Sequence, residues 1–266
     1  MYELDFIKFK INYSAVLVLI KREILAFLRS KARIITSIAQ GLFFLLVFSS
    51  GFSQFNIQIG DKFVDPKPYI ASGITAMAIL FTGMFGGLGL MRDNLFGFMK
   101  ELMASPISRR TLMIGKTLGV AFLTLIQCII FLIVSIIFGF FGYDITLIWT
   151  VLLIIPVALL AGIGIVGLSL IISTRIRDFQ SFGLIQTFIV MPMFWLSGAL
   201  MSINFFPNWM QIAMKWNPYT YTVDLFRFIL LGVSFFPIWM DLLVMSCFGI
   251  IMILLGAWSF NKMNVS

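Results

Sequence analysis

Residues 117–143 read TLGVAFLTLIQCIIFLIVSIIFGFFGY, and no residue in this stretch is charged. A helix of about 20 apolar residues is long enough to cross the roughly 30 Å hydrocarbon core of a bilayer. The whole chain has the same character: of its 266 residues, 61% are hydrophobic and 11% are charged, against about 25% charged residues in soluble domains. The stretch therefore predicts a membrane-spanning helix in an integral membrane protein.

Charge-free runs of this kind recur along the chain and predict one all-α domain of six spans at residues 34–261. The expected spans lie at about residues 34–54, 69–91, 112–138, 147–173, 180–201 and 238–260. The fifth run, 179–214, is too long for one helix and too short for two with a turn. We therefore expect a span followed by short helices at the outer face. A shorter run at 228–240 favours a re-entrant or interfacial piece.

Basic residues gather on one side of the predicted membrane. Fifteen of the 19 Lys and Arg fall in residues 1–33, 92–116, 175–178 and 262–266, together with six of the 11 acidic residues. Loops rich in Lys and Arg stay on the cytoplasmic side. Both termini, including the tail at 262–266, are therefore expected in the cytoplasm. The net charge of +8 then reflects orientation and gives no reason to expect a nucleic-acid partner.

Ahead of the first span, residues 1–33 contain an amphipathic helical pattern. Its apolar members are Tyr13, Leu17, Ile20, Ile24, Phe27 and Leu28, and Lys21, Arg22 and Arg29 lie elsewhere around the helix. Such a pattern predicts a helix that lies along the inner membrane surface, with its basic residues near lipid headgroups. A soluble helix packed on a partner is the alternative.

The residue types that enzymes and ion-coupled transporters need are scarce. The chain has no histidine, and its two cysteines, Cys128 and Cys247, sit apart within apolar runs. Neither a disulfide framework nor a cysteine-based metal site is supported. Among residues of the spans, ionisable groups are nearly absent, with Asp241 at a span edge. This argues against an intramembrane enzyme, which needs a nucleophile with a base or paired carboxylates, and against a secondary transporter or channel with ion sites.

Gly115-Lys116-Thr117 ends the stretch KELMASPISRRTLMIGKT, residues 100–117, and resembles the end of a nucleotide-binding P-loop. A P-loop needs G-x-x-x-x-G-K-[ST] between a strand and a helix, so that glycine amides cradle the phosphates. Arg110 stands where the first glycine should be. No nearby segment predicts a nucleotide-binding fold, so this tripeptide is expected at the foot of the third span.

The loop before that span predicts one short helix followed by a helix start. Asp93 can cap a helix with Leu95, Phe98, Met99 and Leu102 along one face, and Pro106 ends it because proline pushes the preceding residue out of the helical region. Ser108 can then cap the third span. Arg109 and Arg110 fall in its first turn, where the helix dipole disfavours positive charge. Either lipid headgroups or an acidic partner should compensate.

Three amide side chains, Gln40, Gln127 and Gln186, fall within the first, third and fifth predicted spans. They can line a polar pathway or hydrogen-bond between helices, and the second use is common in membranes. Small residues at Gly83 and Gly87, and at Ala158 and Gly162, have the four-residue spacing that allows helices to approach closely.

Three segments in order resemble one family. Arg92-Asp93-Asn94, then the run from Glu101 to Arg109 and Gly115-Lys116, is similar to the cytoplasmic loop of type-2 ATP-binding-cassette (ABC) exporter permeases. Residues 196–200, 206–209, 217–221 and 224–227 resemble the family's segment between spans five and six, and Lys21-Arg22-Glu23 with Arg29 resembles its basic element before span one. The resemblance is closest to the drug-resistance branch. Asp93-Asn94-Leu95 departs from the Glu-Arg-Gly of many members.

The resemblance implies a transport subunit without catalytic residues or a cofactor of its own. Two permease chains would pair, each docked on one of two ABC ATPase subunits that bind ATP and Mg, in a prokaryotic plasma membrane. The residues it assigns to a coupling helix that contacts the ATPase are Leu95, Phe98, Met99, Glu101, Leu102, Pro106 and Arg109. Those it assigns to an extracellular gate are Trp209, Asn217, Pro218 and Tyr221.

The expected substrate is a hydrophobic or amphipathic molecule, drug-like or lipid, exported by ATP hydrolysis on the partner. Export of a polysaccharide or a lipid-linked glycan by the same architecture is the alternative, and an ion-independent secondary transporter or an intramembrane enzyme is less favoured.

Overall fold

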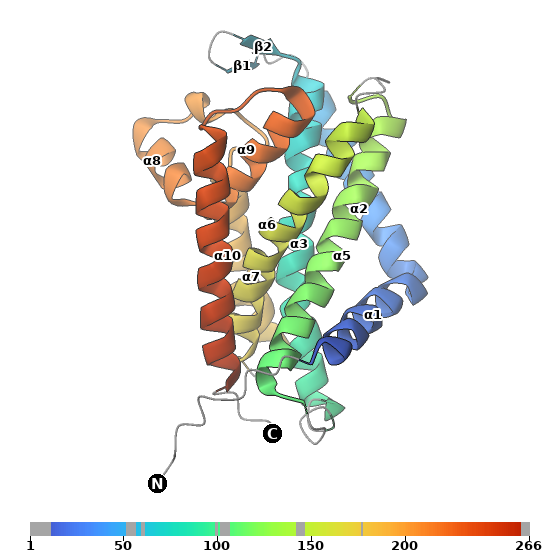
Figure 1. The fold of residues 1–266 in the computed structure, drawn as a ribbon. Helices are drawn as coiled ribbons and strands as arrows, with labels where there is room; N and C mark the ends of the chain where they lie inside the picture. Colours follow the sequence, from blue (N-terminus) through green and yellow to red (C-terminus); the bar gives the residue numbers. More distant parts are fainter. Residues whose placement is uncertain are drawn as a thin grey trace.

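The computed structural model describes residues 12–51, 57–59, 62–98, 101, 107–141, 147–176 and 178–261. Its helices are α1 (Tyr13–Arg29), α2 (Lys31–Gly51), α3 (Pro66–Leu95), α5 (Arg109–Ile137), α6 (Leu147–Ser173), α7 (Phe179–Trp195), α8 (Asn208–Trp216), α9 (Pro218–Leu231) and α10 (Ile238–Asn261), with a 3-10 turn, η1 (Ile203–Phe205). A short antiparallel hairpin, β1 (Ile57–Ile59) with β2 (Lys62–Val64), was not predicted. The all-α fold class is confirmed (Figure 1).

Five helices of the described chain are long and apolar enough to cross a membrane: α2, α3, α5, α6 and α10. Helix α7 is apolar but has 17 residues, and it ends at Trp195 rather than near residue 201. The chain leaves α7 through a turn in which Gly198 has a φ of 72°. Glycine adopts this left-handed conformation without the steric cost that a Cβ brings.

The charge-free run at 228–240 is not one continuous element in the structure. Helix α9 continues through Leu231, and Gly232 ends it in the left-handed conformation at φ 67°. Helix α10 begins at Ile238. The run therefore spans the end of one helix, a loop and the start of the next.

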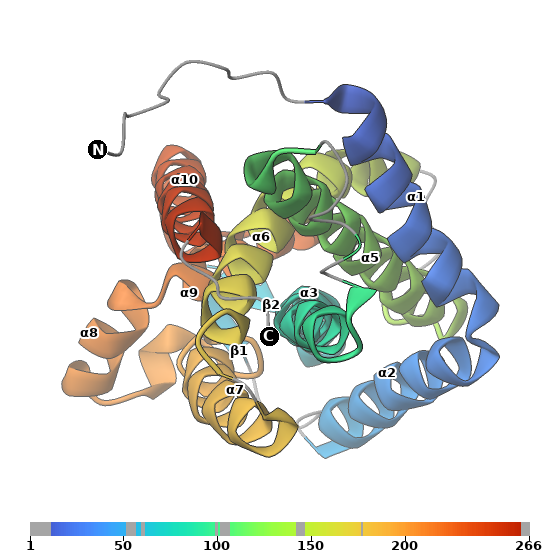
Figure 2. The ribbon, with the colours of Figure 1, turned by 90° about the horizontal axis from the view of Figure 1, so that it is seen from below.

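Helix α3 lies in the middle of the bundle, with α5, α6, α7, α9 and α2 packed around it (Figure 2). Small residues make these contacts close. A Cβ added at Gly73 would lie 1.9 Å from the carbonyl oxygen of Ala199, and one at Gly83 would lie 2.9 Å from Ile165. The predicted close approach at Gly87 and Gly162 is also confirmed, against Ser169 and Thr124.

Helix α1 crosses the lower part of α5 at a steep angle (Figures 1 and 2). Val16, Leu19 and Phe27 are its buried residues, while Tyr13 and Leu17 are exposed. The predicted apolar stripe is therefore divided: one face packs on the bundle and another stays open. The start of α1 and the end of α10 lie at the lower end of the bundle, and the hairpin and α8 lie at the opposite end (Figure 1).

Candidate functional site

Four charged side chains meet at the lower end, where α1, α3 and α5 come together. We call Arg22, Glu23, Asp93 and Lys116 the inner charge cluster. Lys116 Nζ donates to Glu23 Oε1 at 2.6 Å and also to Asp93 Oδ2. Arg22 donates to Asp93 through Nη2 at 3.0 Å and Nη1 at 3.3 Å. Two acids thus balance two bases, which is the usual condition for burying charge.

The role of Asp93 differs from the predicted helix cap. Helix α3 continues past it to Leu95, and the Asp93 side chain is buried between Arg22 and Lys116. The capping pattern is local, whereas both partners of Asp93 are distant in sequence. The sequence did contain a signal for this pairing. Lys116 and Glu23 both lie beside apolar helix positions, and buried charges are almost always paired.

The Gly-Lys-Thr tripeptide is explained residue by residue. A Cβ at Gly115 would lie 2.5 Å from Leu19 Cδ1, so glycine allows α1 to reach α5. Lys116 holds the inner charge cluster, and Thr117 Oγ1 donates to the carbonyl of Met113 within its own helix. No part of this geometry resembles a phosphate cradle. Its position at the foot of α5 is as predicted.

The predicted coupling residues lie partly outside the described part of the chain. Met99, Leu102 and Pro106 are outside the described residues. Leu95 ends α3 and is exposed, and Glu101 is exposed. Arg22 lies over the Phe98 ring at 3.9 Å, so Phe98 touches the inner charge cluster.

Helix α5 begins as the sequence predicts. The backbone N–H of Thr111 donates to Ser108 Oγ at 3.2 Å, which confirms the Ser108 cap. Arg109 is the first residue of α5 and is exposed. The loop between α3 and α5 therefore joins two helix ends that the inner charge cluster holds together.

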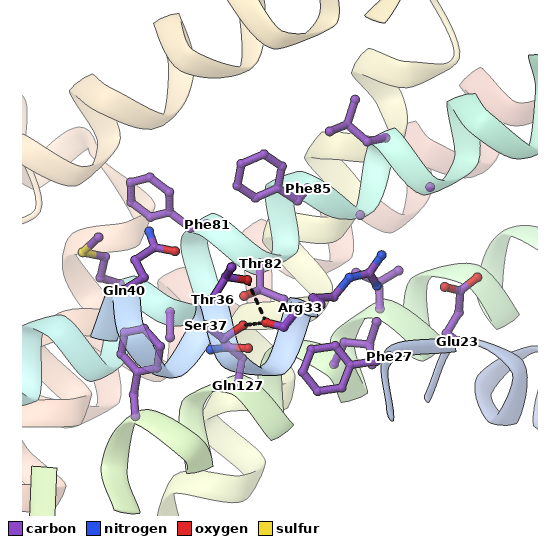
Figure 3. Close-up of a pocket in the computed structure, with 18 of the residues that line it drawn as sticks. Glu23, Phe27, Arg33, Thr36, Ser37, Gln40, Phe81, Thr82, Phe85 and Gln127 are labelled. Carbon is purple, nitrogen blue, oxygen red and sulfur yellow. Dashed lines mark hydrogen bonds between the residues drawn. The ribbon is translucent and has the colours of Figure 1, made fainter. Parts of the chain in front are cut away.

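A cavity of about 470 Å³ opens between α1, α2, α3 and α5, and Phe179 at the start of α7 also lines it. Gln40 and Gln127, two of the three predicted pathway amides, both line it (Figure 3). Gln127 is buried and Gln40 is exposed. Gln186 does not line this cavity; it is buried in α7, and its Oε1 has no hydrogen-bond partner among the described residues.

A second polar cluster lies at the upper end, where α9 packs under the turn that follows α7. Arg227 is buried, donates to the carbonyls of Gly198 and Ala199, and lies 3.7 Å from the centre of the Tyr69 ring. Asp224 accepts from the backbone amides of Phe235 and Phe236. Burial raises the pKa of the Asp224 carboxyl from its ordinary value, and those two amide bonds oppose the shift. Sequence reasoning had not assigned either residue a structural role.

Three of the four predicted gate residues meet near the start of α9. Asn217 Nδ2 donates to the carbonyl of Met193 at 2.7 Å, and its Oδ1 accepts from the Tyr219 amide. Pro218 is the first residue of α9, and the hydroxyl of Tyr221 donates to the carbonyl of Lys215 at 2.7 Å. They tie α7, α8 and α9 together. Trp209 is apart from them, exposed on α8.

Within the described ranges, no group of three His, Cys, Asp or Glu side chains is placed to hold a metal ion. The inner charge cluster and the cluster around Arg227 connect helices through ion pairs and hydrogen bonds.

The ABC-2 type transporter family matches residues 14–231 of this chain. A putative transport permease, ycf38, from Porphyra purpurea is 27% identical over 214 residues, which cover 79% of this chain and 72% of that protein. A probable doxorubicin resistance ABC transporter permease protein, DrrC, from Mycobacterium tuberculosis is 25% identical over 173 residues, which cover 63% of this chain and 60% of that protein. Nodulation protein J of Rhizobium meliloti is 26% identical over 97 residues, covering 36% and 37%. The matched region runs from α1 to α9, so it includes the inner charge cluster, the cavity, and Asp224 and Arg227.

Proposed function

This chain belongs to the ABC-2 type transporter family, and we propose that it is the membrane-spanning permease subunit of an ABC exporter. In this proposal α2, α3, α5, α6, α7 and α10 cross a prokaryotic plasma membrane. Helix α7, at 17 residues, is at the short end of the range of about 17–25 residues for a spanning helix. Both termini are cytoplasmic, since the Lys- and Arg-rich loops mark that side.

Two such chains would pair around a pathway, each docked on a separate ATPase subunit that binds ATP and Mg. The chain itself supplies no ATPase site. Residues 95–109 would form the contact, with Glu101 and Arg109 as its charged members. The short helices α8 and α9, with Asn217 and Tyr221 at their junction, would form the outer gate.

The inner charge cluster is the observation that carries this proposal. It joins α1, the end of α3 and the start of α5 through ion pairs to Lys116 and Arg22. The loop expected to contact the ATPase connects the last two of these helices. A push on that loop would therefore be passed to three helices as one unit, because the buried pair of Lys116 and Asp93, with Glu23 and Arg22 bound to it, holds a fixed geometry.

The lining of the cavity and the names of the relatives support the proposed substrate class. A cavity that combines aromatic side chains with charged and polar ones suits an amphipathic molecule. The DrrC relative is named for doxorubicin resistance, which favours a drug-like or lipid substrate over a polysaccharide. Transport of a lipid-linked glycan remains the alternative within the same architecture.

Co-purification tests the assembly, and two substitutions test the coupling. The full chain should bring down a nucleotide-binding subunit in equal amount. Glu101→Gln and Arg109→Gln should abolish most of the substrate-stimulated ATPase activity of the complex while the permease inserts at normal levels. Lys67→Gln, at the start of α3 at the opposite end, is the matched control and should change nothing. Full stimulation in both loop variants would rule out this coupling role.

A further inference from the structure

The cavity between α1, α2, α3 and α5 carries its charged residues at one end, and the rest of its wall is apolar with several hydroxyl and amide side chains. On α2, Arg33, Ser37 and Gln40 fall at helical spacing on one face, and all three line the cavity (Figure 3). On α3, the lining runs from Arg92 back to Met77. The fifteen steps from Met77 to Arg92 correspond to about 22 Å at 1.5 Å per residue. The cavity is therefore long, with both arginines toward the lower end.

The two arginines provide positive charge that nothing else described balances. Neither the Arg33 nor the Arg92 guanidinium forms a hydrogen bond or ion pair with a residue that the structure describes. Glu23 is the acidic residue of the lining. Its carboxylate is already bound to Lys116 at 2.6 Å and lies 3.8 Å from Arg22. A ligand at this end therefore meets two uncompensated positive charges.

The rest of the wall is apolar and aromatic. Its members include Phe27, Met77, Phe81, Phe85 and Phe131. The hydroxyls of Thr36 and Ser37 donate to carbonyls of their own helix, so they offer acceptor lone pairs and little else. The Gln127 amide is buried and lines the same wall. This surface suits a hydrocarbon or aromatic tail with one or two polar atoms.

We propose that this cavity binds an anionic amphiphile, with a phosphate headgroup at Arg33 and Arg92 and one apolar tail along the aromatic wall. The volume of about 470 Å³ falls within the range of roughly 300–1,000 Å³ for small-molecule sites. A terminal phosphate carries about −1.5 to −2 charges at neutral pH, which matches two guanidinium groups. Guanidinium also binds phosphate in a bidentate geometry.

The same charges disfavour an amphiphilic cation, because like charges repel. The inference rests on the proposed function in one respect, the placement of both arginines on the cytoplasmic side of the membrane. With that orientation the ligand enters from the inner leaflet. It deepens that function by naming the class of molecule. Binding itself requires neither ATP nor a partner.

Equilibrium binding to the purified full chain, in neutral detergent and without any ATPase, tests the site. The probe is a fluorescent lysophosphatidic acid. Lysophosphatidylcholine with the same tail, a long-chain alkylamine and inorganic phosphate serve as competitors. We expect the unlabelled phosphate lipid to compete at least tenfold better than each of these three.

Variants separate the headgroup contact from the tail contact. Arg33→Gln and Arg92→Gln should each weaken binding about tenfold, the loss of one charge-assisted hydrogen bond. Gly89 lines the cavity, and a Cβ there meets nothing within 4 Å. Gly89→Leu should therefore fill the cavity without disturbing the helix and abolish binding.

Matched controls lie away from the cavity. Gly183→Leu on α7 is equally open, and Lys215→Gln removes one positive charge at the other end. Both should bind the probe normally. Unchanged thermal midpoints of all variants show that they are folded.

Several results would overturn the inference. One is that lysophosphatidylcholine, the alkylamine or inorganic phosphate competes with the probe as well as the unlabelled phosphate lipid does. Another is that the Arg33→Gln, Arg92→Gln double variant binds the probe as tightly as the wild type. Unchanged binding in Gly89→Leu together with an altered oligomeric state would mean that a second copy of the chain fills the cavity. A chain that binds the probe as expected but never transports with an ATPase would leave this inference standing and remove the proposed function.

Discussion

Lys116 and Asp93 form an ion pair between α5 and α3 that is nearly closed to solvent, with side-chain exposed fractions of 4% and 5%. Glu23 of α1 shares the same lysine. A buried pair of this kind adds little net stability over an apolar contact, but removing one partner leaves a buried charge without compensation. The cluster therefore acts mainly by fixing how three helices meet.

Replacing Lys116 tests how much the inner charge cluster contributes to stability. Lys116→Met should lower the free energy of unfolding by about 3–5 kcal/mol, because Asp93 and Glu23 lose their shared partner. Denaturant titration of the purified chain in detergent measures it. The double variant Lys116→Met, Asp93→Asn should lose less than the single one. If it loses more, the buried charges are compensated in some other way.

A second prediction concerns the contact between α3 and the turn after α7. Gly73→Ala places a Cβ 1.9 Å from the carbonyl oxygen of Ala199, a backbone atom. The backbone has to move, and overpacking typically costs about 1–3 kcal/mol. Gly183→Ala, in open space on α7, is the control and should be neutral or stabilising by up to about 1 kcal/mol. Equal stability of the two variants would contradict the close packing.

Replacing Arg227 tests the polar cluster at the upper end of the bundle. Arg227→Met leaves the carbonyls of Gly198 and Ala199 without their donor. We expect a loss of about 2–3 kcal/mol in the free energy of unfolding, since hydrogen bonds from charged groups are at the strong end of the range. Protease cleavage within residues 196–217 should also become faster. Wild-type stability with wild-type cleavage would show that this arginine does not hold the turn.

Replacing Asp241 is expected to keep or raise the stability of the protein, unlike the substitutions above. Its side chain is buried, and neither carboxylate oxygen has a hydrogen-bond partner among the described residues. Asp241→Asn removes the charge without changing the size, so stability should be kept or raised by about 1–3 kcal/mol. Thermal unfolding alongside the wild type measures this. A clear loss of stability would mean that the carboxylate is compensated within the assembly.

Several features follow from local sequence and were predictable. Hydropathy over about 20 residues identifies a membrane helix whatever its neighbours are, and the apolar run at 117–143 begins inside α5. The Ser108 cap depends on the backbone three residues later. The paired small residues Gly83 and Gly87 signal a close helix approach. Each of these signals is contained within a few turns of chain.

Features that depend on distant partners were not predictable in this way. Asp93 has the pattern of a helix cap, yet it pairs with Arg22, 71 positions away, and with Lys116. Gln40 and Gln127 share a cavity, while Gln186 does not reach it. Which face of a helix meets which neighbour is decided by packing over the whole bundle, because helical spacing leaves the choice of partner open.

By itself the sequence determined that this protein is an integral membrane chain of apolar helices with a basic loop before the third span, and it pointed to its family. The tertiary structure alone decided that the lysine of Gly-Lys-Thr holds α1 and α3 to α5. It also decided that two arginines of α2 and α3 face one cavity. The physical reason is that hydrophobicity and capping act locally along the chain, whereas ion pairs and cavities need residues that only folding brings together.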